Sequence, residues 1–177
     1  SVDSSGFANN TADYGGAVHV VFSAVMLRDS DFHGNSADSG GALRVMSSEL
    51  TLDGNSLLRN SGRSAGALNF SGLQSGSVIA TGNEIAHNRA SYCGAMLLEG
   101  DITLTKNRIQ DNRATQGFGG AICSDRTKMD LTSNTVLSNS AKSDGGFLHI
   151  SVDDAEVNLL DNFILDNQAR DGGAIFI

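Results

Sequence analysis

Carboxylates are the side chains of this 177-residue chain with the clearest potential for chemistry. Polysaccharide lyases, hydrolases and epimerases need two or three of them, or carboxylates beside Lys, Arg or His, on one face of the fold. Asp111 and Asp166 occupy one position of the repeat described below, with Ser138 between them, whereas Asp53 and Asp130 occupy different positions. Most surface carboxylates only solvate a protein. We therefore predict no catalytic residue and no enzyme, and keep a carbohydrate-active protein as the alternative.

Histidines and the acidic residues near the C-terminus give no metal or cofactor motif. His19 and His149 share a repeat position but lie five repeats apart, too far to bind one metal ion. The acidic residues of 153–156, and Asp161 with Asp166, are candidates for attracting Ca²⁺, but the calcium-binding nonapeptide repeat is missing. We expect no cofactor and no specific metal site.

The two cysteines are too few for a disulfide framework and match no zinc-binding spacing. Cys93 and Cys123 stand in neighbouring repeats but four positions apart within the repeat. A disulfide needs Cα atoms within roughly 7 Å of each other. We therefore expect two free thiols.

Charge and composition exclude several classes of partner. The net charge of −8 and the pI near 4.7 disfavour nucleic acids. No apolar run reaches the roughly 18 residues of a membrane span, so we expect no direct membrane insertion. With 40% hydrophobic and 18% charged residues, the chain has the composition of a folded protein.

Two elements alternate along the whole chain at a period of 24–28 residues. The first is Gly-Gly-Ala-aliphatic, with starts at Gly15, Gly40, Ala65, Cys93, Gly119, Gly145 and Gly172. The second is an aliphatic or aromatic residue followed three positions later by Asn. Five repeats carry another Asn five residues earlier, and the residues before it alternate between apolar and polar, which is typical of a strand.

Each repeat thus holds three short strand-like segments, and its turns are too short for a helix. This pattern predicts an all-β fold, a parallel β-helix of about seven coils of 24–28 residues with three short strands per coil. We expect a right-handed path from the general preference of parallel crossovers. Residues 1–177 form one solenoid segment, which we expect to be a piece of a longer repeat protein.

The repeated polar and glycine columns have a structural explanation. Asn tolerates the left-handed backbone of a corner, and stacked Asn side chains satisfy polar groups at a buried bend. Glycine permits positive φ and a close approach between coils. The predicted Asn ladder consists of Asn10, Asn35, Asn60, Asn88, Asn112, Asn139 and Asn167. The predicted corner glycines are Gly16, Gly41, Gly66, Gly94, Gly120, Gly146 and Gly173.

The alternation of FxxN with GGA(I/L/V) resembles the repeats of the chlamydial polymorphic membrane proteins, which are autotransporter-type adhesins. Similar repeats occur in extracellular proteins of protists and algae. Leu, Ile or Val replaces Phe in five of the seven FxxN copies, and Phe147 replaces Ala in one GGA copy. The matches include Phe7-Ala8-Asn9-Asn10, Phe32-His33-Gly34-Asn35, Gly15-Gly16-Ala17-Val18, Gly40-Gly41-Ala42-Leu43, Gly119-Gly120-Ala121-Ile122 and Gly172-Gly173-Ala174-Ile175. The resemblance implies surface display and adhesion, and no catalytic residues.

From these patterns we expect a non-catalytic structural or adhesive module that works outside the cell or at its surface. Its expected partners are adjoining coils or modules of the same protein, and other proteins or glycans at the surface. An ice-binding β-helix is a second alternative, with Thr103-Leu104-Thr105 as its one complete Thr-x-Thr copy. The sequons at Asn69 and Asn9 are possible glycosylation sites, and Asn69 is the better candidate because its repeat position faces outward.

Overall fold

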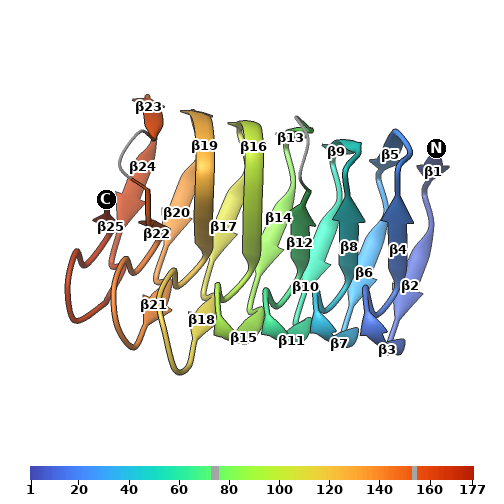
Figure 1. The fold of residues 1–177 in the computed structure, drawn as a ribbon, viewed down its shortest axis with the longest axis horizontal. Helices are drawn as coiled ribbons and strands as arrows, with labels where there is room; N and C mark the ends of the chain where they lie inside the picture. Colours follow the sequence, from blue (N-terminus) through green and yellow to red (C-terminus); the bar gives the residue numbers. More distant parts are fainter. Residues whose placement is uncertain (73–75, 153–154) are drawn as a thin grey trace.

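A computed structural model of the chain describes residues 1–72, 76–152 and 155–177, except for the side chains of residues 126 and 127. The described residues form an all-β parallel solenoid without helices, in which each coil lies against the next along one axis (Figure 1). No described segment is a helix long and apolar enough to cross a membrane. The predicted fold class is confirmed.

The strands of successive coils build three sheets. Sheet A is the widest side and contains β1 (Val2–Asp3), β4 (Val18–Val21), β5 (Val25–Arg28), β8 (Leu43–Met46), β9 (Glu49–Asp53), β12 (Leu68–Ser71), β13 (Ser77–Thr81), β16 (Met96–Thr105), β19 (Ile122–Thr132), β22 (Leu148–Ile150), β23 (Glu156–Leu160) and β25 (Ile175–Phe176). In two middle coils its two parts fuse into the long strands β16 and β19.

The other two sheets are narrow. Sheet B contains β2 (Gly6–Ala8), β6 (Asp31–His33), β10 (Ser56–Leu58), β14 (Glu84–Ala86), β17 (Arg108–Gln110), β20 (Thr135–Leu137) and β24 (Phe163–Leu165). Sheet C contains β3 (Thr11–Tyr14), β7 (Ser36–Ser39), β11 (Ser61–Ser64), β15 (Arg89–Tyr92), β18 (Arg113–Ala114) and β21 (Ser140–Ala141).

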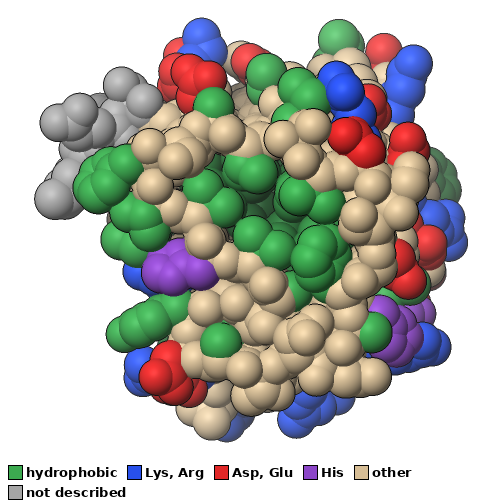
Figure 2. Space-filling model, turned by 90° about the vertical axis from the view of Figure 1, so that its right-hand side faces the viewer, with side chains coloured by type: hydrophobic (Ala, Val, Ile, Leu, Met, Phe, Trp, Pro, Cys, Tyr) green, Lys and Arg blue, Asp and Glu red, His purple; other side chains and the backbone are tan. Residues whose placement is uncertain are grey.

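The register pairs equivalent repeat positions. Leu57 of β10, for example, lies between Phe32 of β6 and Ile85 of β14, and all three side chains are fully buried. Because every strand pair is parallel and in step with the repeat, one inward position becomes a continuous row through the core. Phe7 and Phe32 stack in this row with ring centroids 4.8 Å apart. Seen along the axis from the end that carries β1, hydrophobic side chains gather at the centre and charged ones at the rim (Figure 2).

In the Asn ladder, the side-chain donors and acceptors of each interior Asn are hydrogen-bonded to the neighbouring coils. The Asn112 Oδ1 atom accepts from the backbone N–H of Asn88 and from its side-chain Nδ2. The Nδ2 of Asn112 donates to Asn139 Oδ1 at 3.0 Å and to the carbonyl oxygen of Ile85 at 2.9 Å. The same pattern runs from Asn10 to Asn167. A second ladder connects Asn55, Asn83, Asn107, Asn134 and Asn162 at the preceding corner.

The structure corrects one part of the predicted Asn role. The left-handed residue at each of these corners is the one before the ladder Asn, with φ between 52° and 64° at Asn9, Gly34, Arg59, His87, Asp111, Ser138 and Asp166. The ladder Asn residues themselves have no positive φ. Their side chains are needed for hydrogen bonding at a buried bend, and the neighbouring residue makes the turn.

The two positions of each GG corner differ in backbone conformation and in their contacts. The first position has φ between 52° and 65°, and Ala65 and Cys93 adopt this conformation in place of Gly. At the second position, a Cβ on Gly16, Gly41, Gly66, Gly94, Gly120 or Gly146 would lie 1.9–2.3 Å from the carbonyl oxygen of the equivalent residue in the next coil. The first position is crowded as well, since a Cβ on Gly15, Gly40, Gly119, Gly145 or Gly172 would lie 2.1–2.5 Å from the carbonyl oxygen three residues later. Ala65 and Cys93 show that two coils nevertheless accommodate a side chain there.

Candidate functional site

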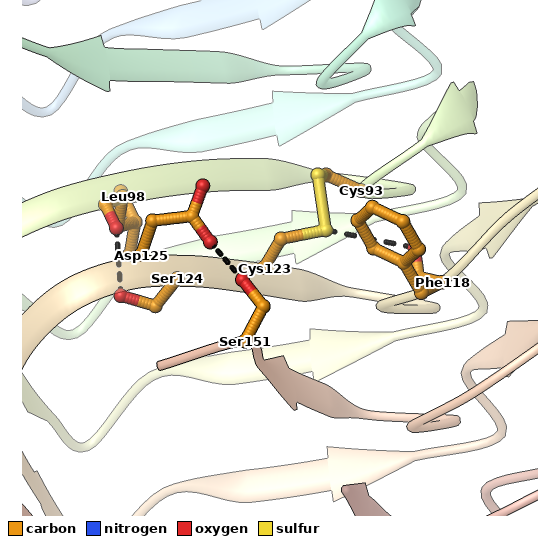
Figure 3. Close-up of a disulfide and its surroundings, with 7 residues drawn as sticks. All are labelled: Cys93, Leu98, Phe118, Cys123, Ser124, Asp125 and Ser151. Atoms are coloured by element: carbon orange, nitrogen blue, oxygen red, sulfur yellow. Dashed lines mark hydrogen bonds between the residues drawn. A yellow bond between two sulfur atoms is a disulfide. The ribbon is translucent and has the colours of Figure 1, made fainter. Parts of the chain in front are cut away.

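Cys93 and Cys123 form a disulfide between two neighbouring coils, with Cα atoms 5.2 Å apart (Figure 3). The expectation of free thiols is wrong. Cys93 occupies the left-handed first position of a GG corner, which turns its Cβ back toward the strand that follows the corner. A Cβ at Gly119, the equivalent residue one coil on, would lie 2.5 Å from Cys123 Sγ. Two residues that are four positions apart in the repeat therefore come into contact, because the chain turns a corner between these positions.

The disulfide is shielded by its surroundings. Cys93 and Cys123 are 3% and 2% exposed and cluster with Ala65, while Leu97 and Phe118 pack against them. The Cys123 Sγ atom lies 3.5 Å from the carbonyl oxygen of Phe118. The bond is thus part of the packed corner rather than an exposed surface link.

A row of rings continues from the disulfide along the solenoid. Tyr92 contacts Phe118, Phe118 stacks on His149 with centroids 4.3 Å apart, and His149 stacks on Phe176. His149 is 7% exposed, and its Nδ1 has no hydrogen-bond partner within the described part of the chain. Burial lowers the pKa of His149 below its ordinary value, and Asp144 and Asp125 oppose this effect. His149 is therefore a neutral ring in a stack at neutral pH.

The candidate carboxylates do not converge. Asp111 and Asp166 stand at corners with positive φ, are exposed, and have Ser138 between them. The Oδ2 atom of Asp111 lies 3.8 Å from Nδ1 of His87. His87 belongs to the preceding coil, so the neighbour of Asp111 is a histidine and not a second carboxylate. Asp130 accepts a hydrogen bond from Asn158 Nδ2 at 2.9 Å on sheet A. The prediction of no catalytic residue stays a prediction.

The metal candidates are equally dispersed. Across residues 1–72, 76–152 and 155–177, no three His, Cys, Asp or Glu side chains come together as metal ligands. Asp161 and Asp166 occupy exposed corners of successive bends. Asp153 and Asp154 lie outside the described residues.

The two sequons differ from their expected ranking. Asn69 stands at an outward position of β12 but is only 4% exposed, and its Nδ2 donates to Ser39 Oγ at 2.7 Å. Asn9 is exposed at a left-handed corner. Because the side-chain nitrogen is the atom that carries an N-linked glycan, Asn9 is the more accessible acceptor in the folded chain.

Similarity to known proteins agrees with this architecture. The model of the right-handed β-helix region matches residues 2–164. The chain belongs to the right-handed β-helix family. No curated protein and no solved structure matches the chain significantly. This assignment supports the right-handed path expected from the crossover preference.

In the part of this right-handed β-helix that the structure describes, two shallow depressions over sheet C stand out. One of about 660 Å³ lies over β18 and β21 and is lined by Arg113, Thr115, Ser140, Lys142, Gln168, Arg170 and the alanines between them. The other, of about 420 Å³, lies over β3, β7 and β11. Sequence reasoning missed both, although the signal was present in the residues one and three positions after each ladder Asn.

The structure also places the other sequence candidates. On sheet B, the outward side chains of Leu58, Leu137, Phe163 and Leu165 are more apolar than solvent requires; Phe163 and Leu165 are 58% and 46% exposed, and Leu58 and Leu137 are half-buried. Thr103 pairs with Ile79 on one side and with Asp130 on the other. The Thr-x-Thr array of an ice-binding face is therefore interrupted by an apolar and a charged side chain.

Proposed function

We propose that the chain is a non-catalytic structural and adhesive module of an extracellular or cell-surface protein. The solenoid holds side chains at a fixed rise along an axis, and the outward positions, which differ between coils, provide the binding faces. Its partners are adjoining coils or modules of the same protein, and proteins or glycans at a surface.

The observation that carries this proposal is the disulfide between neighbouring coils. Disulfides form and persist in oxidising compartments and are rare in reducing ones. A bond between Cys93 and Cys123 therefore favours an exported protein. Its buried position fits a structural bond rather than a redox-active one.

The resemblance of the FxxN and GGA(I/L/V) repeats to the chlamydial polymorphic membrane proteins supports adhesion in particular. In this chain, those motif residues supply the ladder and the corners, so they build the scaffold and leave the outward positions free to vary. Such variation suits a family of surface proteins that present different faces on one framework.

The test measures adhesion and turnover with the same preparation. Beads coated with the folded chain should bind to cell or matrix surfaces saturably, and free chain should compete. Beads coated with reduced, denatured chain are the control, and equal binding by both would overturn the adhesive function. Release of new reducing ends or unsaturated products from polygalacturonate or alginate, lost in an Asp111→Asn, Asp130→Asn and Asp166→Asn variant, would establish the enzyme alternative instead.

A further inference from the structure

Five cations stand on the outer side of sheet C and its continuation in the last coil. We call Arg63, Arg89, Arg113, Lys142 and Arg170 the basic strip; all five are exposed. They occupy the positions one and three residues after a ladder Asn, and from Ser61 to Arg170 no Asp or Glu occupies either position. A chain with 12 Lys and Arg against 20 Asp and Glu has thus gathered five of its cations on one narrow face.

Neighbouring cations of the basic strip repel one another. Arg89 and Arg113 are direct register partners on β15 and β18, strands that lie about 4.8 Å apart. Like charges directly opposite each other destabilise a sheet. In the described part of the chain, Arg170 makes ion pairs with Asp144 and Asp171, while the other four cations make none. Unpaired neighbouring cations favour a bound anion.

The depression over β18 and β21 gives that anion a place to lie. Its side chains are the cations Arg113, Lys142 and Arg170, with Thr115, Ser140 and Gln168 as hydrogen-bonding groups. Between these side chains it is lined by Ala114, Ala141 and Ala169, of which Ala114 is buried. These residues come from three successive coils, so the depression extends along the solenoid axis, which suits an extended chain.

The other depression of sheet C shows that charge, not backbone shape, distinguishes this region. It is likewise lined by small residues, Ala12, Ala37 and Gly62, but its charged side chains are Asp13, Asp38 and Arg63. The two depressions are therefore alike in construction and differ in charge: one holds three cations, the other two carboxylates and one cation.

The rest of the molecule restricts which anion fits. Removing the five cations of the strip from the total leaves a strongly acidic surface, which repels a broad polyanion such as duplex nucleic acid or an anionic membrane. A single sugar chain is narrow enough to contact the strip alone. Arginine pairs with carboxylate or sulfate through two parallel hydrogen bonds, and the Thr, Ser and Gln side chains match sugar hydroxyls.

We propose that the basic strip binds a linear anionic glycan, a sugar chain bearing carboxylate or sulfate groups, laid along the solenoid axis over sheet C. The proposal rests on the adhesive function and names its ligand. The adhesion of the module is then electrostatic and directional, because the strip runs along the solenoid axis from Arg63 to Arg170, with one cation in each coil.

The experiment compares two triple variants of the full chain. Arg89→Gln, Arg113→Gln and Lys142→Gln remove three cations of the strip, whereas Arg59→Gln, Lys106→Gln and Arg108→Gln remove three exposed cations elsewhere. Binding of heparin, polygalacturonate, neutral dextran and duplex DNA is measured by calorimetry at several salt concentrations. Thermal unfolding checks that both variants fold.

We expect heparin or polygalacturonate to bind, with affinity that falls steeply as salt is added. The strip variant should lose at least about tenfold in affinity, since each lost contact involves a charged hydrogen bond, while the control variant keeps most of it. Binding of polygalacturonate would show that carboxylate groups suffice, whereas binding of heparin alone would show that sulfate is needed, because heparin carries both groups. Equal losses in both variants, equal binding of dextran, tighter binding of DNA, or no glycan binding would overturn the proposal.

The result of the glycan-binding experiment can be distinguished from the result of the bead-adhesion experiment. If coated beads adhere to surfaces but neither the strip variant nor added glycan changes the adhesion, the module is an adhesin that uses another face. If the beads do not adhere at all, the adhesive function itself falls.

Discussion

At the scale of single residues, the buried side-chain amides of the Asn ladder stabilise the fold although they are polar. A buried polar group left without a partner costs about 1–3 kcal/mol. Each interior ladder Asn removes that cost for two backbone groups of the preceding coil, and its side chain also donates to the Asn of the next coil. The ladder therefore fixes the register of the coils as well as filling the bend.

Replacing Asn112 by Ala should lower the free energy of unfolding by about 3 kcal/mol, because the Asn88 N–H and the Ile85 carbonyl lose their partners. Urea unfolding measures the change. Asn158→Ala is the matched control, since its one hydrogen bond to Asp130 is exposed. A loss as small as that of the control would contradict the role of the ladder.

The titration of His149 is the second prediction at this scale. Burial lowers its pKa below the ordinary 6.5, so the unfolded chain binds the proton more readily than the folded chain. The free energy of unfolding should therefore be highest above about pH 6.5 and should decrease as the pH falls toward the folded-state pKa.

The variant His149→Phe, which keeps a ring between Phe118 and Phe176, should flatten this acid-side decrease. Unfolding measured between neutral and mildly acidic pH checks it. His19→Gln, at the same repeat position but exposed, should leave the decrease unchanged. An unaltered pH profile in His149→Phe would exclude this ring as its source.

At the scale of elements, the disulfide closes a loop of one coil. Cys93 and Cys123 are 30 residues apart, so the bond removes conformational freedom from the unfolded chain. A variant with Cys93→Ala and Cys123→Ala should lose roughly 3 kcal/mol of stability. Thermal unfolding with and without a thiol reductant measures it. The reductant should destabilise the native protein and not the variant; equal sensitivity of both would count against a formed bond.

At the scale of the whole molecule, stability is expected to be uneven along the axis. Each coil contacts only its neighbours, so local opening depends on how well a coil is covered. Inward side chains from Leu43 to Leu131 are almost all 0–2% exposed, whereas β3 and most of β24 are exposed.

Hydrogen exchange of the backbone amides should therefore be slowest in β8 through β19 and fastest in β3 and β24. Mass spectrometry of peptides after timed exchange resolves these regions. Uniform protection along the chain would show instead that the solenoid opens as one cooperative unit.

The repeat alone determined the architecture of this protein. Its period, its strand alternation and its invariant second glycine identify a coil with three strands, and the coil fixes which residues face the core. These features are local and recur in seven repeats, so each repeat gives independent evidence for the same coil. The Asn ladder was predictable for the same reason, since a buried bend needs amide groups in every coil.

Only the tertiary structure decided what lies next to what across a corner. The left-handed turn at Cys93 brings it to Cys123, although the linear spacing within the repeat argues against contact. Asn69 is likewise buried at an outward position, where it donates a hydrogen bond to Ser39 across a corner. The basic strip is likewise scattered over more than a hundred residues of sequence and becomes one surface only when the coils stack. Neighbours of this kind depend on backbone direction and coil stacking, which residue types and spacing do not encode directly.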